Sequence, residues 1–498
     1  MAGSCIEDCL LVEAVNCEIG RPREGCRVVA VAYREERKLS IRELAGIRPL
    51  LSILCTLVMT GTLVVSPGLV APAAASSLPR PASFEPDIGF WKSIFGTYSR
   101  NQVVLHDNRH LGIVYMVLDF RPADDPGRVL NRKERRVREK RVKSEQKRIE
   151  AALERLHRFA GRPPKMTPLE ARVRDRVTRV SPGLNYAKAS GRVRAQSGLR
   201  ESFSAGLIRQ SGYLAEMETI FRKRGLPVSL ARMPLVESCF DVDAYSKVGA
   251  AGVWQFMPRT GRQYLKINSA LDERRDPIRA TEAAAEHLRR DHEALGSWPL
   301  AVTAYNHGRG GMQRAIRSHG SDFESMVRTY RGRRFGFASR NFYIELLAAI
   351  DVSRDAESYF GELPKLESPE LREVKLRRSM RLQDAARHVG VPREQLLATN
   401  PAFLRRVRYG VDRIPRGYRL RVPRSARDAS LATRRRDLGR SSAGKPEPRV
   451  VVHRVARGQT LGGIARRYGS TVREIQKMNG VRNPRRIQAG QDLIIPLG

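Results

Sequence analysis

A single carboxylate ends an apolar run near the middle of the chain. The run extends from Leu230 to Val236, and Glu237 follows it directly. A carboxyl group at the end of an apolar helix, where little water reaches it, has a raised pKa and carries a proton at neutral pH. A protonated carboxyl of this kind can act as a general acid on a glycosidic oxygen. The local pattern leaves the alternative open, a Glu that is simply solvated at a helix end.

Helical segments are expected to position this carboxylate. From Thr167 to Asp355 the apolar residues recur mostly at helical spacing. Ala280 to Leu288 is Ala-rich and amphipathic, and Phe342 to Ile350 is a last apolar helix. Between these two lies an apolar helix that ends in A-Y-N-H, residues 304–307. The sequence therefore predicts a mainly helical domain around Glu237.

Length and charge limit the classes of function. The chain has 498 residues, which predicts two to four domains, and 41% of them are hydrophobic, too few for a polytopic membrane protein. The formal net charge is +39, which favours nucleic acid, anionic lipid or an acidic cell-wall polymer as partner. The charge alone does not distinguish among these partners. A general preference for Arg in the protein, unrelated to any partner, is the alternative explanation of the charge. Residues 131–160 alternate Glu with Lys or Arg at helical spacing but lack stacking aromatics, which favours a solvated basic helix over a nucleic-acid interface.

The N-terminal part predicts export. Residues 49–78 carry no charged side chain, and their apolar core ends before the small residues Ala73 to Ala75. This pattern is typical of a secretory signal cleaved near Ala75; an uncleaved membrane anchor is the alternative. The polar stretch before it is long for a signal, so we expect its first few dozen residues to be an artefact of the assigned start. Its four cysteines have no C-x-x-C pair, which disfavours a metal site.

Two further regions flank the predicted helical domain. Residues 86–120 suggest a small packed segment with one helix and a strand. His106 and Asp107 in this segment are expected to be a surface pair, and a functional site is the alternative. Beyond Ser368, residues 374–423 and 452–496 look like two distant copies of one unit, a strand, two helices and a strand. The charged stretch between them is expected to be a linker.

Three motifs, taken in order, carry a resemblance to a known family. They are L-V-E-S-C-F at 235–240, S-K-V-G-A-A-G-V-W-Q-F-M-P-R-T-G at 246–261, and A-Y-N-H-G-R-G at 304–310. Together they resemble the lytic murein transglycosylases, whose catalytic domain is similar to goose-type lysozyme. Residues 452–496 are similar to a LysM module. This combination resembles the membrane-bound lytic murein transglycosylase D family.

The resemblance implies roles for individual residues. Glu237 matches the catalytic acid, and Tyr305 and Asn306 match the signature that faces it. Ser238 matches the residue that usually follows the acid. Tyr343, in N-F-Y-I-E, falls where family members often carry a Tyr in the substrate groove. The remaining substrate contacts that the resemblance implies are those of the groove motif: Ser246, Gly249, Gly252, Gln255 and Met257.

The resemblance also implies the reaction and the location. No second carboxylate stands in a recognisable motif, and Asp241 would lie beside Glu237 if the helix continued. This favours a lytic reaction at the bond between N-acetylmuramic acid and N-acetylglucosamine, with formation of a 1,6-anhydro end. A goose-type hydrolase and a non-catalytic wall-binding protein are the alternatives. The expected partners are peptidoglycan glycan strands, and the expected location is the periplasm or cell envelope. No nucleic acid, cofactor or metal is expected. The N-terminal segment is expected to be a further contact to the membrane.

The expected fold is a mainly α, lysozyme-like domain followed by small α+β modules of βααβ type. The expected division of the chain is an N-terminal extension with signal peptide at 1–75, an N-terminal region with a basic helix at 76–166, the lysozyme-like domain at 167–360, a degenerate LysM-like module at 370–424, a linker at 425–449 and a LysM module at 450–498.

Overall fold

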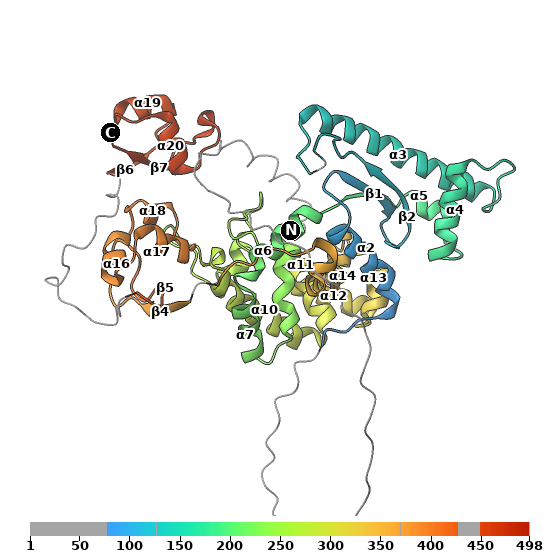
Figure 1. The fold of residues 1–498 in the computed structure, drawn as a ribbon, viewed down its shortest axis with the longest axis horizontal. Coiled ribbons are helices and arrows are strands. Elements are labelled where there is room, and N and C mark those ends of the chain that lie inside the picture. The colour runs from blue at the N-terminus through green and yellow to red at the C-terminus, as the bar shows by residue number, and fades with distance from the viewer. Residues whose placement is uncertain (1–76, 126, 369, 427–448, 498) are drawn as a thin grey trace, which may run out of the picture.

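The computed structural model describes residues 77–497 except 126, 369 and 427–448 (Figure 1). The expected signal peptide and most of the expected linker lie outside the described residues. Each helix of the described residues is either too short or too polar to span a bilayer. The predicted fold class is confirmed: the described residues are mainly helical, with small antiparallel sheets.

The central region is built from helices around one apolar core. Its first helix comes from early in the chain, because α2 (Glu85–Gly96) packs along α14 (Phe337–Arg354). Both the Ala-rich helix and the last apolar helix expected from the sequence are present, within α10 and α14. The other helices of this region are α6 (Arg200–Ser211), α7 (Leu214–Lys223), α8 (Met233–Ser238), α9 (Pro258–Gly261), α10 (Pro277–Leu295), α11 (Trp298–His307), α12 (Arg309–His319), α13 (Phe323–Thr329) and α15 (Ala356–Phe360).

Local chemistry fixes the ends of α10. The carboxylate of Asp276 accepts hydrogen bonds from the backbone N–H groups of Ile278 and Arg279, which otherwise have no partner in the helix. Pro277 occupies the first position, where no N–H is needed. Gly296 ends the helix with φ +79°, a conformation that glycine adopts without steric cost. Helix α10 contributes His287 to the cleft that contains Glu237.

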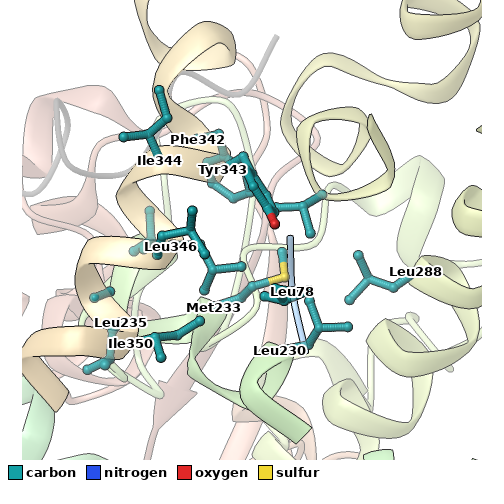
Figure 2. Close-up of a cluster of buried hydrophobic side chains, with 14 of the residues drawn as sticks. Leu78, Leu230, Met233, Leu235, Leu288, Phe342, Tyr343, Ile344, Leu346 and Ile350 are labelled. Atoms are coloured by element: carbon teal, nitrogen blue, oxygen red, sulfur yellow. The ribbon is translucent and has the colours of Figure 1, made fainter. Parts of the chain in front are cut away.

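The short helix that carries Glu237 is held in this core. Figure 2 shows Leu230, Met233 and Leu235 from the segment just before Glu237, together with Leu346 and Ile350 of α14. All five are at most 5% exposed. Burying each such side chain stabilises the fold by about 1.5–3 kcal/mol, so the position of α8 is strongly determined.

A three-stranded sheet forms a second core. The strands β1 (Gln102–Asp107), β2 (Val114–Asp119) and β3 (Val193–Ser197) are antiparallel in the order β2-β1-β3. The helices α3 (Arg132–Arg158), α4 (Pro168–Val180) and α5 (Tyr186–Ser190) pack with this sheet. The long helix α3 is teal in Figure 1, and the strands β1 and β2 are blue. The packing therefore does not follow the predicted boundary between residues 166 and 167.

Two expectations for this second region are wrong. The sequence predicted one strand where the chain forms a hairpin, and β3 joins it from far along the chain. His106 and Asp107 are not a surface pair, because both are completely buried in β1.

The basic helix α3 is solvated on one face only, since Ile149, Leu153 and Leu156 are buried against the sheet.

The C-terminal part contains the two expected copies. The first consists of β4 (Leu371–Lys375), α16 (Leu382–Val389), α17 (Arg393–Thr399), a short extra helix α18 (Arg405–Arg408) and β5 (Arg419–Pro423). It docks on the central region: Arg421 pairs with Glu216 at 2.7 Å, and Leu271 lies in its apolar core. The second copy consists of β6 (Val450–Arg454), α19 (Leu461–Arg467), α20 (Val472–Asn479), the 3-10 turn Pro484–Arg486 and β7 (Asp492–Pro496).

Candidate active site

The backbone turns sharply after Glu237. Helix α8 ends at Ser238, and Cys239 and Phe240 both have positive φ, +48° and +58°. Such conformations are unusual for side chains other than glycine and persist only where surrounding contacts hold them. The guanidinium of Arg209 donates two hydrogen bonds to the carbonyl of Cys239, at 2.7 and 3.1 Å. The strained turn thus gives Glu237 a fixed position at the helix end.

The Glu237 carboxyl is secluded from water. The residue is 5% exposed, and its side chain has no hydrogen bond or ion pair with any described residue. Desolvation by burial raises its pKa to about 8. The carboxyl therefore carries a proton at neutral pH, and the alternative of a solvated helix-end Glu is wrong.

Glu237 lines a cleft with a volume of about 790 Å³. The cleft contains a single carboxylate within the part of the chain that the structure describes. Asp241 and Asp243 stay outside it, because α8 ends before Asp241 and Asp243 pairs with Arg275 on the surface. The other lining residues include Arg194, Gln255, Phe256, Met257, Thr260, Gln263, His287, Tyr305, Asn306, His307, Arg309, Arg334, Phe337 and Ser339.

Gln255 and Tyr305 are held by the backbone of one turn. Gln255 has φ +47°, and its amide donates to the carbonyl of Gly252 at 2.7 Å. The hydroxyl of Tyr305 donates to the carbonyl of Trp254 at 2.8 Å. Burial, and next the nearby Glu237 charge, raise the pKa of Tyr305 well above its ordinary value. Tyr305 thus lies close to the Glu237 carboxyl, but its hydroxyl donates its hydrogen bond to the backbone carbonyl of Trp254 and not to Glu237.

Asn306 and Met257 also lie where the motifs place them. Asn306 lines the cleft, and its side-chain oxygen accepts a hydrogen bond of 2.9 Å from the hydroxyl of Ser339. This bond joins the end of α11 to the beginning of α14. Met257 lines the cleft immediately before α9. Five of the ten predicted site residues therefore meet at the cleft: Glu237, Gln255, Met257, Tyr305 and Asn306.

Three of the other predicted residues hold the loop that follows α8. The hydroxyl of Ser238 donates to the carbonyl of Val253 at 2.9 Å, and the hydroxyl of Ser246 accepts from the N–H of Ala250 at 2.9 Å. Gly252 has φ +73°, and a Cβ there would lie 1.8 Å from the carbonyl oxygen of Arg274. Gly252 is required by the approach of the protein's own backbone, not by that of a sugar. None of the three lines the cleft.

The last two predicted site residues, Gly249 and Tyr343, do not line the cleft. Gly249 does not line the cleft; its φ of +91° explains the glycine. Tyr343 lies in the core and not in the groove, because it falls on the side of α14 that packs inward. Its ring is fully buried in the apolar cluster of Figure 2. Its hydroxyl donates to the carbonyl of Pro79 at 2.5 Å.

Sequence reasoning missed a polar row that reaches the wall of the cleft at His287. The hydroxyl of Tyr264 lies 3.2 Å from Nδ1 of His287, and Nε2 of His287 lies 3.6 Å from the buried carboxylate of Asp291. Asp291 also pairs with Arg309. Burial lowers the pKa of His287, so its ring is neutral at pH 7. The spacing of His287 and Asp291, one helical turn apart, was the available signal.

Comparison with known proteins gives two family matches and several relatives. The model described as the transglycosylase SLT domain matches residues 218–325, and the LysM domain model matches residues 453–496. Membrane-bound lytic murein transglycosylase D of Escherichia coli K12, and that of E. coli O6:H1, are each 29% identical to this chain over 304 residues. The aligned region covers 58% of this chain and 65% of each relative, so the chain spans slightly less than two thirds of their length. The chain thus carries a transglycosylase SLT domain and a LysM domain, and it is similar to membrane-bound lytic murein transglycosylase D.

Proposed function

We propose that this chain is a peptidoglycan lytic transglycosylase. It cleaves the β-1,4 bond between N-acetylmuramic acid and N-acetylglucosamine and leaves a 1,6-anhydromuramoyl end. One observation carries the proposal: the cleft holds a single carboxyl, Glu237, which is buried and protonated at neutral pH. A hydrolase with two carboxylates needs a second one across the sugar, and no other carboxylate of the described residues lines this cleft.

A single carboxyl is sufficient for the lytic reaction. Glu237 gives its proton to the glycosidic oxygen as the bond from that oxygen to the muramoyl C1 breaks. The muramoyl 6-hydroxyl then forms the new bond to C1 and returns its proton to the Glu237 carboxylate. The attacking hydroxyl belongs to the same sugar, so its effective concentration is high and no water has to be positioned. The enzyme ends the cycle in its starting protonation state.

The other cleft residues support the same reaction. The side chain of Gln255 and the side chain of Asn306 present amide groups to the cleft, suited to the hydroxyl and acetamido groups of the two sugars. The apolar surfaces of Met257 and Phe337 provide faces on which sugar rings pack. Desolvation by these walls maintains the raised pKa of Glu237.

The LysM domain at the C-terminus adds a second contact to the same polymer. We propose that it binds glycan strands and keeps the catalytic domain at the cell wall, which places the protein in the cell envelope. The apolar segment at 49–78, typical of a secretory signal, agrees with that location. The high positive charge also suits an acidic wall polymer.

Product analysis tests the reaction. Purified murein is digested, and the fragments are analysed by mass spectrometry. Anhydro ends, lighter by one water than reducing ends, are the expected result. Reducing muramic ends alone would overturn the proposal in favour of a hydrolase. Release of no fragment by a folded protein that still binds murein would favour the non-catalytic alternative.

The variant Glu237→Gln tests the role of the carboxyl. The amide has nearly the same shape but cannot deliver a proton, so the variant is expected to lose cleavage and to retain sacculus binding through the LysM domain. Cleavage at the wild-type rate by this variant would contradict the assignment of Glu237.

A further inference from the structure

The first C-terminal copy is joined to the central region by backbone pairing. A loop before α10 forms an antiparallel bridge with the connection between α17 and β5 of that copy. The N–H of Asp272 donates to the carbonyl of Ala402 at 2.9 Å, and the N–H of Leu404 donates to the carbonyl of Ala270 at 3.0 Å. Leu271, within this loop, is completely buried in the apolar core of the first copy. The central region thus completes the core of the copy that docks on it.

The two C-terminal copies share one architecture but differ in this connection. In each, an Asn at the end of the second helix bonds to the backbone of the closing strand. Asn400 accepts from the N–H of Arg421 at 3.0 Å and donates to its carbonyl at 2.8 Å. Asn479 makes the same two bonds with Ile494, both at 2.7 Å. The connection that follows is exposed at residues 482–486 of the second copy, whereas the central region pairs with it in the first.

The first copy also carries charged side chains toward the central region. Arg421, which stands where the second copy has an Ile, pairs with Glu216 of α7 at 2.7 Å and lies 3.9 Å from the carboxylate of Asp276. Glu373 of β4 pairs with Arg279 of α10. Asp276 is the residue that caps α10. The copy therefore contacts α7, the beginning of α10 and the loop between the groove motif and α10.

That loop reaches the cleft wall through one buried arginine. The carboxylate of Asp272 accepts two hydrogen bonds from the guanidinium of Arg274, at 2.7 and 2.9 Å. The remaining nitrogen of this guanidinium donates to the carbonyls of Gly249 and Phe256, at 2.7 and 2.8 Å. Arg274 is 2% exposed, so water does not compete for these bonds. Arg274 thus joins the two ends of the turn that contains Gln255, a residue of the cleft wall.

We propose that the first copy is a positioning element of the catalytic cleft. It fixes residues 270–272, and the pair of Asp272 and Arg274 connects them to the turn that presents Gln255. The copy acts only through the protein, because none of its described residues lines the cleft. This rests on the proposed function, since the reaction at Glu237 is the one that the copy supports. A small displacement of the turn lowers the rate of the chemical step more than it lowers the affinity for glycan.

Two substitutions weaken the docking, and neither changes a residue of the copy's apolar core. Leu404→Pro removes one N–H donor of the bridge, at a φ of −81° that proline can adopt. Arg421→Ile removes the pair with Glu216 and introduces the residue that the second copy has at this position. We expect each change to lower kcat on short soluble glycans about fivefold and to alter KM by less than about twofold.

Arg381→Pro is the matched control for the first of these changes. Arg381 is exposed and, like Leu404, stands immediately before a helix of the copy, with a φ of −69°. Its N–H donates to no described residue, so proline removes no hydrogen bond to the central region. We expect this variant to keep the wild-type kcat and KM.

A double-mutant cycle tests the connection through Arg274. Arg274→Lys keeps the charge but loses the planar fork that reaches Asp272 and both carbonyls, and we expect kcat to fall about tenfold. If the copy acts through this arginine, adding Leu404→Pro should lower kcat by less than about twofold further. Independent effects would instead multiply to about fiftyfold.

Each other result counts against the proposal. A wild-type kcat in both docking variants would overturn it, as would an equal fall in Arg381→Pro or multiplied effects in the double variant. Thermal unfolding shows which variants fold, and Arg421→Ile decides if Leu404→Pro does not. Absence of anhydro products from the wild-type protein would overturn the proposed function and not the positioning role alone.

Discussion

The hydroxyl of Tyr305 donates a hydrogen bond of 2.8 Å to the backbone carbonyl of Trp254. It connects the end of α11 to the turn that presents Gln255 to the cleft. Gln255 has φ +47°, so its conformation depends on contacts of this kind. The indole N–H of Trp254 donates in turn to Thr281 of α10, at 2.8 Å. Three segments that are distant in sequence thus fix the wall beside Glu237.

Replacing this hydroxyl tests its role in positioning. Tyr305→Phe keeps the ring, which stacks parallel to Phe342 at 6.5 Å, and leaves the Trp254 carbonyl without its donor. We expect a loss of about 1–3 kcal/mol in stability and a fall of about tenfold in kcat, because a small displacement in an active site is costly. Cleavage of soluble glycan and thermal unfolding are the measurements. Tyr330→Phe, at a hydroxyl that bonds to no described residue, is the control; equal effects of the two changes would contradict the special role of Tyr305.

The raised pKa of Glu237 predicts an unusual pH dependence. The reactive form is the protonated one, which is present below a pKa of about 8 and is lost as the pH rises through it. We expect kcat/KM on soluble glycan to be maintained up to about pH 8 and then to fall about tenfold per pH unit. Initial rates from pH 5 to pH 10 at constant ionic strength measure this. A fall that begins near pH 4.5, the ordinary value for a Glu, would show that burial does not hold the proton.

The two glycines of the groove motif should differ in their tolerance of a methyl group. Both have positive φ, but a Cβ on Gly252 would meet the carbonyl oxygen of Arg274 at 1.8 Å, whereas one on Gly249 would lie 3.8 Å from Pro258. Gly249→Ala therefore adds backbone strain alone, about 1 kcal/mol. Gly252→Ala adds an overlap that the backbone must move to relieve, about 3 kcal/mol or more. Thermal unfolding of the two variants measures the difference; equal stability would contradict this account of Gly252.

The motifs predicted the part of the site that is local in sequence. Glu237, Gln255 and Tyr305 lie in short segments whose residue types indicate their place, and all three reach the cleft. The opposite wall was not predictable, because Arg194 arrives on β3 and Phe337 on α14, and no local pattern marks either one. Tyr343 was placed in the groove because of its neighbours in sequence. Along α14 the cleft ends near Ser339, and the helix continues into the core, where burial of the Tyr343 ring determines its position.

In the fold, too, the elements that depend on neighbouring residues were predictable, and those that depend on pairing with distant residues were not. The helices and the two C-terminal copies followed from periodicity and turn residues, which act within a few positions. The N-terminal sheet did not, because β1 pairs with β3 across the whole of α3, α4 and α5. The strand at 193–197 has only a brief alternation, with Val193 and Ala195 as its apolar residues, which is too short to predict a strand without its partner. For the same reason His106 and Asp107, polar residues that are completely buried in β1, looked like a surface pair.

Removing the LysM domain separates binding from cleavage. The domain has its own apolar core, with Leu461, Ile464, Ile475, Leu493 and Ile495 all at most 2% exposed, so deletion of residues 449–498 should leave the central core intact. We expect the truncated protein to bind insoluble murein at least tenfold more weakly, because two linked sites on one polymer raise the effective concentration of each. Cleavage of short soluble glycans, too short to reach both sites, should change by less than about twofold. Sedimentation with sacculi and initial rates on soluble fragments measure the two effects, and equal losses in both would show that the domain does not act by targeting.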